Sequence, residues 1–214
     1  MLKQTLRHAF WSGIASGMLV GIGGTVYLSC ENKVVGAVLF SVALLCICLL
    51  GLYLYTGKIG IFMEKPDKVS ALALPVGLAG NVLGAALTGV LTALAKPSLI
   101  DAAQKACTAK LENGYLRGLI AAVFCGVLMY AAVKTYAKGK TLVGIIFCIP
   151  TFILCGFEHS VADMYYFTVA SFGGFDLTSI LFMLVAVVGN TLGGWLLPVL
   201  MRLGEGKETN NESK

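Results

Sequence analysis

A histidine and two carboxylates lie close together in the segment CGFEHSVADMYYF, residues 155–167, which contains Glu158, His159 and Asp163. Histidine has an ordinary pKa near 6.5, so His159 is the side chain best suited to exchange or polarise a proton around neutral pH. Burial and neighbouring carboxylates act on such a ring in opposite directions, and the sequence leaves its protonation state open. We expect His159 to act on a polar solute; the alternative is a neutral histidine that hydrogen-bonds across helices.

Enzymatic chemistry is a poor explanation of this segment. Ser160 directly follows His159, and sequence neighbours seldom form a nucleophile–base pair, which also needs a third, orienting group. The other histidine, His8, is near the N-terminus, and the seven cysteines match no metal-binding spacing. We therefore expect no enzyme activity, no metal and no cofactor.

The elements around this segment are strongly apolar. Of the 214 residues, 57% are hydrophobic and only 13% charged, with a mean hydropathy of +0.85, whereas soluble domains carry about 25% charged residues. Uncharged segments of about 20 residues are typical of membrane-spanning helices. The sequence predicts six spans, at about 8–29, 34–55, 70–95, 114–136, 141–172 with an interruption, and 178–202.

This pattern predicts an all-α integral membrane protein with a transmembrane channel domain at 1–203 and a disordered polar tail at 204–214. Lys and Arg are more frequent in the segments on the N-terminal side of the membrane than in those opposite. By the positive-inside rule, both termini are then cytoplasmic. The net charge of +5 reflects this topology, and we expect no nucleic-acid partner.

The two halves of the chain, about 8–96 and 112–202, repeat a pattern. GLYLYTGKIG is followed by AGNVLGAAL in the first half, and CGFEHSVADMYYF by VGNTLGGWL in the second. A duplicated unit of three spans must lie inverted in the membrane, and inverted repeats with broken helices are a common transporter design. Broken backbone is tolerated at that depth where it is buried or lines a cavity. The repeat therefore predicts a transport pathway, with broken second and fifth helices.

Several short motifs together resemble the formate/nitrite transporter family. They extend over nearly the whole chain: Gly51–Gly57 with the pair Tyr55-Thr56, Lys110 in AKL, Cys125-Gly126, Gly156-Phe157-Glu158-His159-Ser160 followed by Ala162-Asp163-Met164, and Gly189-Asn190-x-x-Gly193-Gly194. Their correct order makes the resemblance specific, although any one of them alone would be weak.

The resemblance implies a homopentamer in the bilayer, with an aquaporin-like pore in each protomer. Such pores pass small monovalent anions such as formate, nitrite and hydrosulfide, and in some members acetate or lactate. By position, Leu54 with Phe152 on one side and Leu44 with Met129 on the other would form hydrophobic constrictions around His159, and Tyr55 is counted with them.

The resemblance also implies polar roles. Thr56 and Asn190 would hydrogen-bond near the histidine, and Lys110 would be the vestibule cation, with Lys105 as its rival. We interpret Glu158 as a loop anchor that accepts N–H bonds from the broken loop of the first half.

Three positions depart from the family pattern and leave the choice of substrate open. Gly126 replaces a pore-facing Asn, Asp163 stands where Asn is common, and Lys58 stands where an uncharged residue is usual.

We expect an anion channel or proton-linked anion transporter in a prokaryotic inner membrane, with formate as the first candidate and nitrite and hydrosulfide close behind. Burying a bare anion is very costly, so a weak acid crosses an apolar constriction more easily in its neutral form. The alternative is an aquaporin-like channel for water or another small neutral solute, although the Asn-Pro-Ala tripeptide of aquaporins does not occur in the sequence.

Overall fold

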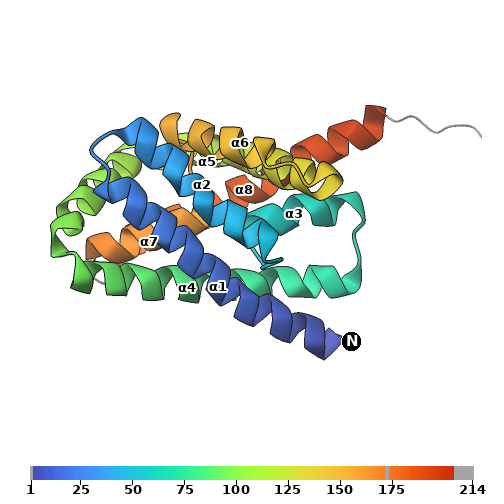
Figure 1. Ribbon diagram of the computed structural model, residues 1–214, viewed down its shortest axis with the longest axis horizontal. Coiled ribbons are helices and arrows are strands. Elements are labelled where there is room, and N and C mark those ends of the chain that lie inside the picture. Colours follow the sequence, from blue (N-terminus) through green and yellow to red (C-terminus); the bar gives the residue numbers. More distant parts are fainter. Residues whose placement is uncertain (1, 172–173, 205–214) are drawn as a thin grey trace, which may run out of the picture.

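The computed structural model describes residues 2–171 and 174–204, and every regular element in these ranges is helical (Figure 1). The elements are α1 (Leu2–Ser29), α2 (Lys33–Leu49), α3 (Tyr55–Glu64), α4 (Lys68–Ala95), the 3₁₀ turn η1 (Pro97–Leu99), α5 (Ile100–Gly139), α6 (Val143–Leu154), α7 (Ser160–Ser171) and α8 (Leu177–Gly204).

Side-chain caps fix where several of these helices begin. Asn32 Oδ1 accepts the backbone N–H groups of Val34 and Val35 at the start of α2. Asp67 Oδ1 does the same at the start of α4, where hydrogen bonding by Ser70 lowers the pKa of Asp67. Such caps satisfy N–H groups that have no partner within the helix.

Four helices are long and apolar enough to cross a membrane: α1, α4, the segment Pro97–Gly139 and α8. The fifth predicted span is divided into α6 and α7, whereas the second predicted span contains α2 and ends where α3 begins. The chain is therefore a multi-pass membrane protein, and its shorter helices lie among the long ones (Figure 1).

The two interruptions have the same backbone conformation. Gly51 lies in the first and Gly156 in the second, with φ angles of 66° and 67°. This left-handed conformation favours glycine, because a Cβ would strain it. In the first, Leu52 N donates to Ile47 O at 2.9 Å, and in the second, Phe157 N donates to Phe152 O at the same distance. Each interruption therefore ends the preceding helix, α2 or α6, with the same kind of turn.

The long helices pack in two equivalent pairs, α1 with α4 and α5 with α8. A Cβ on Gly17 would lie 2.2 Å from Asn81 O, and a Cβ on Gly126 would lie 2.4 Å from Asn190 O. Only glycine permits so close an approach of two helix backbones. Figure 1 shows α1 crossing α4 at such an approach.

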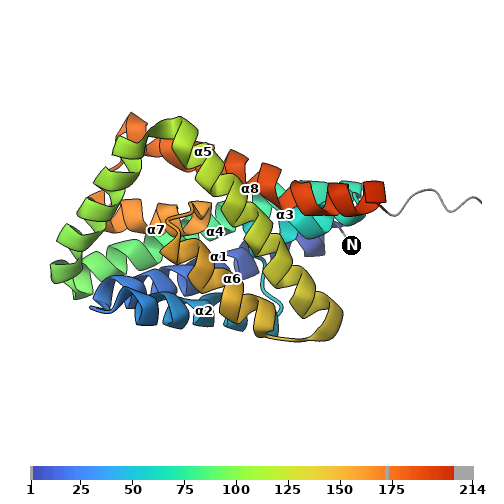
Figure 2. The ribbon, with the colours of Figure 1, turned by 90° about the horizontal axis from the view of Figure 1, so that it is seen from above.

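Several helix boundaries differ from the sequence-based expectation. The structure begins α1 at Leu2 rather than near residue 8 and continues α8 to Gly204. Most of the predicted tail, residues 205–214, lies outside the described residues. The fourth predicted span, 114–136, is preceded by an additional helical segment within α5. The two parts meet at Gly114, whose φ of 78° and ψ of 165° make the corner seen in Figure 2.

Candidate functional site

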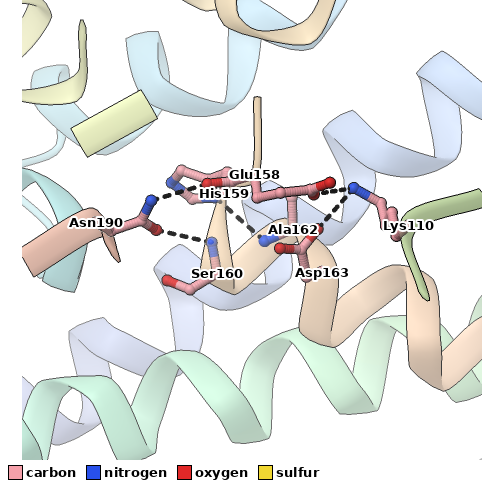
Figure 3. A network of polar contacts seen from close by, with 7 residues as sticks. All are labelled: Lys110, Glu158, His159, Ser160, Ala162, Asp163 and Asn190. Carbon is pink, nitrogen blue, oxygen red and sulfur yellow. Dashed lines mark hydrogen bonds and ion pairs between the residues drawn. The ribbon is translucent and has the colours of Figure 1, made fainter. Parts of the chain in front are cut away.

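Asn190 on α8 holds the second interruption in place. Its Oδ1 accepts the Ser160 N–H at 2.8 Å, and its Nδ2 donates to Glu158 O at 2.8 Å (Figure 3). Its Nδ2 also donates to Ala122 O at 2.9 Å. Both amide hydrogens are thus engaged with backbone oxygens, and the side chain is fully buried. The expected hydrogen bonding of Asn190 near the histidine is present, and its bonds clamp the residues on either side of His159.

Asn81 on α4 makes the same three contacts at the first interruption. Its Oδ1 accepts the Tyr55 N–H at 2.8 Å, and its Nδ2 donates to Gly13 O at 2.8 Å and Tyr53 O at 2.9 Å. Asn81 therefore holds the backbone on either side of Leu54, as Asn190 holds the backbone on either side of His159. The repeated Gly-Asn-x-x-Gly motif is the sequence signal for both clamps.

His159 immediately precedes α7 and caps it. The backbone N–H of Ala162 donates to His159 Nδ1 at 3.2 Å, so this nitrogen holds a lone pair, and the neutral ring carries its hydrogen on Nε2. Nε2 lies 2.9 Å from Thr56 Oγ1, and the ring stacks on Phe152 with centroids 5.6 Å apart. His159 and Thr56 are both buried, and the expected hydrogen bond between them is present.

Lys110 forms an ion-pair cluster with two carboxylates. Its ammonium contacts the Glu158 carboxylate and lies 3.0 Å from Asp163 Oδ1 (Figure 3). The Tyr166 ring centroid is 5.9 Å from Nζ. Two carboxylates therefore oppose one ammonium group, and Lys110, the expected vestibule cation, is ion-paired in this structure. Its rival Lys105 is exposed and belongs to no described cavity.

Glu158 likewise differs from its predicted role. Its carboxylate contacts Lys110, whereas the backbone of the first interruption is held by Asn81. A carboxylate that is nearly buried is stabilised best by an opposite charge, and Lys110 supplies that charge. The anchor of the loop is therefore an amide, and the glutamate belongs to the ion-pair cluster.

The cluster lies in a cavity of about 330 Å³, which we call the Lys110 cavity. His159, Phe152 and Phe40 also line it, together with Asn113, which directly precedes the Gly114 corner of α5. Phe40 packs edge-on against Phe152, with ring centroids 6.4 Å apart. Aromatic rings therefore line this cavity beside the polar cluster.

A second cavity of about 190 Å³, which we call the Lys58 cavity, is lined by Leu44 and Leu54 together with Lys58 and Lys140. The part of α5 after the Gly114 corner is ~35 Å long. Lys140, which lines the Lys58 cavity, directly follows its C-terminal end, whereas the residues of α5 that line the Lys110 cavity precede the corner. On α2, Phe40 faces the Lys110 cavity and Leu44 faces the Lys58 cavity. One helical turn, ~6 Å, therefore separates the two cavities along that helix.

The two cavities are lined by equivalent positions of the repeat. Four residues that line the Lys58 cavity each have a counterpart that lines the Lys110 cavity, always at the same sequence separation. The pairs are Gly51 and Gly156, Leu54 and His159, Lys58 and Asp163, and Ile61 and Tyr166. The same site thus occurs twice, once around a leucine and once around a histidine.

The predicted constriction residues are grouped differently in the structure. Leu54 shares the Lys58 cavity with Leu44, and Phe152 lies in the Lys110 cavity. Met129 is buried in the core and lines neither cavity. The Tyr55 hydroxyl lies 2.7 Å from Thr191 Oγ1, on the α8 side, so Tyr55 also lies outside both linings.

The three unusual positions have distinct environments. Gly126, which replaces the family's Asn, is buried against α8, where a Cβ would lie 2.4 Å from Asn190 O. Asp163 is a member of the ion-pair cluster, and Lys58 is an exposed residue of the Lys58 cavity. Sequence reasoning missed Lys140, because a lysine after an apolar run gives no sign that it lines a cavity.

Comparison with known proteins gives one consistent result. The family model for the formate/nitrite transporter matches residues 1–204. The nitrite transporter NirC of Salmonella typhimurium is 28% identical over 91% of this chain and 81% of its own. The uncharacterized transporter YrhG of Bacillus subtilis is 30% identical over 76% of this chain and 68% of its own.

Two solved structures share the fold. An FNT family ion channel matches with a TM-score of 0.82 and 22% identity, covering 95% of this chain and 96% of its own. A pentameric formate channel with formate bound matches with a TM-score of 0.82 and 18% identity, covering 95% of this chain and 98% of its own. The helical arrangement described above is therefore one that solved channels also adopt.

Proposed function

The chain belongs to the formate/nitrite transporter family, and from that premise we propose that it passes small monovalent anions of weak acids through the membrane. The family and the solved neighbours are channels and transporters, in agreement with the expectation from sequence that the chain is not an enzyme. Formate is the first candidate substrate, with nitrite and hydrosulfide next.

The observation that carries the proposal is the pair of equivalent cavities on either side of one buried neck. Phe152 and His159 face the Lys110 cavity, and Leu54 and Leu44 face the Lys58 cavity. Each of these four side chains is at most 3% exposed. A solute that passes between the cavities therefore meets an apolar seal in which His159, with Thr56, supplies the polar contact.

The neck favours a solute that is small and easily neutralised. A bare anion would lose its hydration there at high cost, whereas a weak acid can cross with a proton bound. His159 Nε2–H is the donor that would polarise the solute. A neutral imidazole is a poor source of a proton, and protonation at Nδ1 would break the Ala162 bond. The accompanying proton therefore comes from solution in the vestibule.

The membrane arrangement proposed with this function has six spans in two inverted repeats, with both termini in the cytoplasm and an inner-membrane location. The repeated asparagine clamps and repeated cavities support the internal repeat. A homopentamer with one pathway in each protomer is proposed because a solved channel of the same fold is pentameric.

Flux into proteoliposomes tests the proposal directly. The purified protein would be compared with empty vesicles for uptake of formate, nitrite, hydrosulfide, acetate and lactate, and for water permeability. We expect saturable flux of one or two of the smaller anions. Water permeability without anion flux, from an intact oligomer, would favour a neutral-solute channel instead.

A further inference from the structure

The two cavities carry opposite charge. Two carboxylates oppose one ammonium group in the Lys110 cavity, through Glu158, Asp163 and Lys110. The residues that line the Lys58 cavity include Lys58 and Lys140 and no carboxylate. Lys58 and Asp163 occupy equivalent positions of the repeat, so one site has opposite signs in its two copies.

Both lysines line the Lys58 cavity, and each ammonium group lies near an aromatic ring. Lys58 Nζ is 5.8 Å from the Tyr53 ring centroid, and Lys140 Nζ is 5.0 Å from the ring centroid of Tyr136, a residue of the lining. Cys48 lines the same cavity. Neither lysine has a carboxylate within ion-pair distance among the described residues, in contrast to Lys110.

We propose that the Lys58 cavity is the anion-gathering vestibule of this protein, and that the Lys110 cavity is the weaker entrance because Asp163 and Glu158 neutralise its lysine. Two unpaired cations in an apolar-walled recess raise the local anion concentration, whereas a cluster with an excess of carboxylate does not. The inference rests on the proposed anion transport and adds to it a side preference. By the charge distribution of the loops, the gathering side is the cytoplasmic one.

The preference has a defined kinetic signature. With no voltage or pH gradient, a passive pathway has the same permeability in both directions at low concentration. A lower half-saturating concentration on one side is therefore accompanied by a proportionally lower maximal rate from that side. We expect formate to saturate at lower concentration from the Lys58 side, and this difference to diminish at 1 M salt, where the Debye length is about 3 Å.

The test measures zero-trans formate flux in each direction in proteoliposomes. The orientation of the protein in the vesicles is determined from protease accessibility of the C-terminal tail. Lys58→Gln and Lys140→Gln are each expected to raise the half-saturating concentration on their side by about two- to fivefold, the effect of one charge 4–8 Å away in water. Lys58→Arg keeps the charge and serves as the rescue variant. Lys138→Gln removes a neighbouring exposed lysine outside the lining and is the matched control.

A second variant tests the opposite cavity. Asp163→Asn leaves one carboxylate against Lys110 and is expected to lower the half-saturating concentration on that side alone. Equal half-saturating concentrations on the two sides of the wild-type protein, unchanged by Lys58→Gln and Lys140→Gln, would overturn the inference while leaving anion transport intact. Absence of flux for any anion would instead overturn the proposed function and, with it, the side preference.

Discussion

Thr56 Oγ1 and His159 Nε2 lie 2.9 Å apart, although 103 residues separate them in the chain. The two side chains come from the two halves of the chain and meet in the buried interior. Because the Ala162 N–H occupies His159 Nδ1, the Nε2 hydrogen points to Thr56 in the resting protein.

Removal of the Thr56 hydroxyl tests whether this bond orients the histidine for transport. Thr56→Val keeps the shape of the side chain and removes one hydrogen bond, so formate flux should fall about fivefold, while Thr56→Ser should retain most of it. Thr88→Val is the control, since the hydroxyl of Thr88 bonds only the Gly84 carbonyl of its own helix. A Thr56→Val protein with wild-type flux would show that the bond has no part in transport.

The two asparagine clamps should contribute equally to the free energy of unfolding. Each buried amide makes three hydrogen bonds to backbone groups, so Asn81→Ala and Asn190→Ala should each lower the free energy of unfolding by about 3 kcal/mol. Thermal unfolding in detergent measures the effect, and the exposed Asn113→Ala is the control. A loss at one clamp only would contradict the structural equivalence of the two halves.

Lys110 should act as a neutralising residue. Lys110→Ala leaves the carboxylates of Glu158 and Asp163 without their cation in a buried site, and should destabilise the protein by about 3 kcal/mol. Addition of Asp163→Asn should restore part of that loss, and Lys105→Ala should have little effect on the melting temperature. If Lys110→Ala changed neither stability nor its response to Asp163→Asn, the ion-pair cluster would not exist in the membrane.

The family-like residue should not fit at position 126. Gly126→Asn places a Cβ 2.4 Å from Asn190 O, so α5 and α8 must separate. We expect a lower melting temperature and less assembled protein rather than improved anion flux. Gly139→Ala is the control, because the nearest side-chain atom to a Cβ there is 3.9 Å away. A stable, fully active Gly126→Asn protein would place this position on the pathway.

The sequence marks the two interruptions and the residues that hold them, because the chemistry of each is local. Gly51 and Gly156 mark turns that need positive φ, and the Gly-Asn-x-x-Gly motifs mark the residues that clamp them. His159 is recognisable as a central residue because it is a polar group between two apolar runs.

What the sequence does not predict depends on contacts between distant segments. The partners of Lys110 lie 48 or more residues away, so a free cation and a neutralised one have the same local pattern. The environment of Gly126 is set by the approach of α8, and the α5 corner at Gly114 is marked only by one glycine. The membership of Lys58 and Lys140 in one cavity likewise arises from packing.

The proposed function requires that anions cross between the cavities at His159. The most direct measurement is formate flux into proteoliposomes for the wild type and for His159→Phe, with His8→Gln as the control and oligomer size checked by light scattering. We predict that His159→Phe assembles normally and loses at least tenfold of the flux, because the seal then has no hydrogen-bond donor at its centre. Near-normal flux through assembled His159→Phe would contradict a pathway at this site.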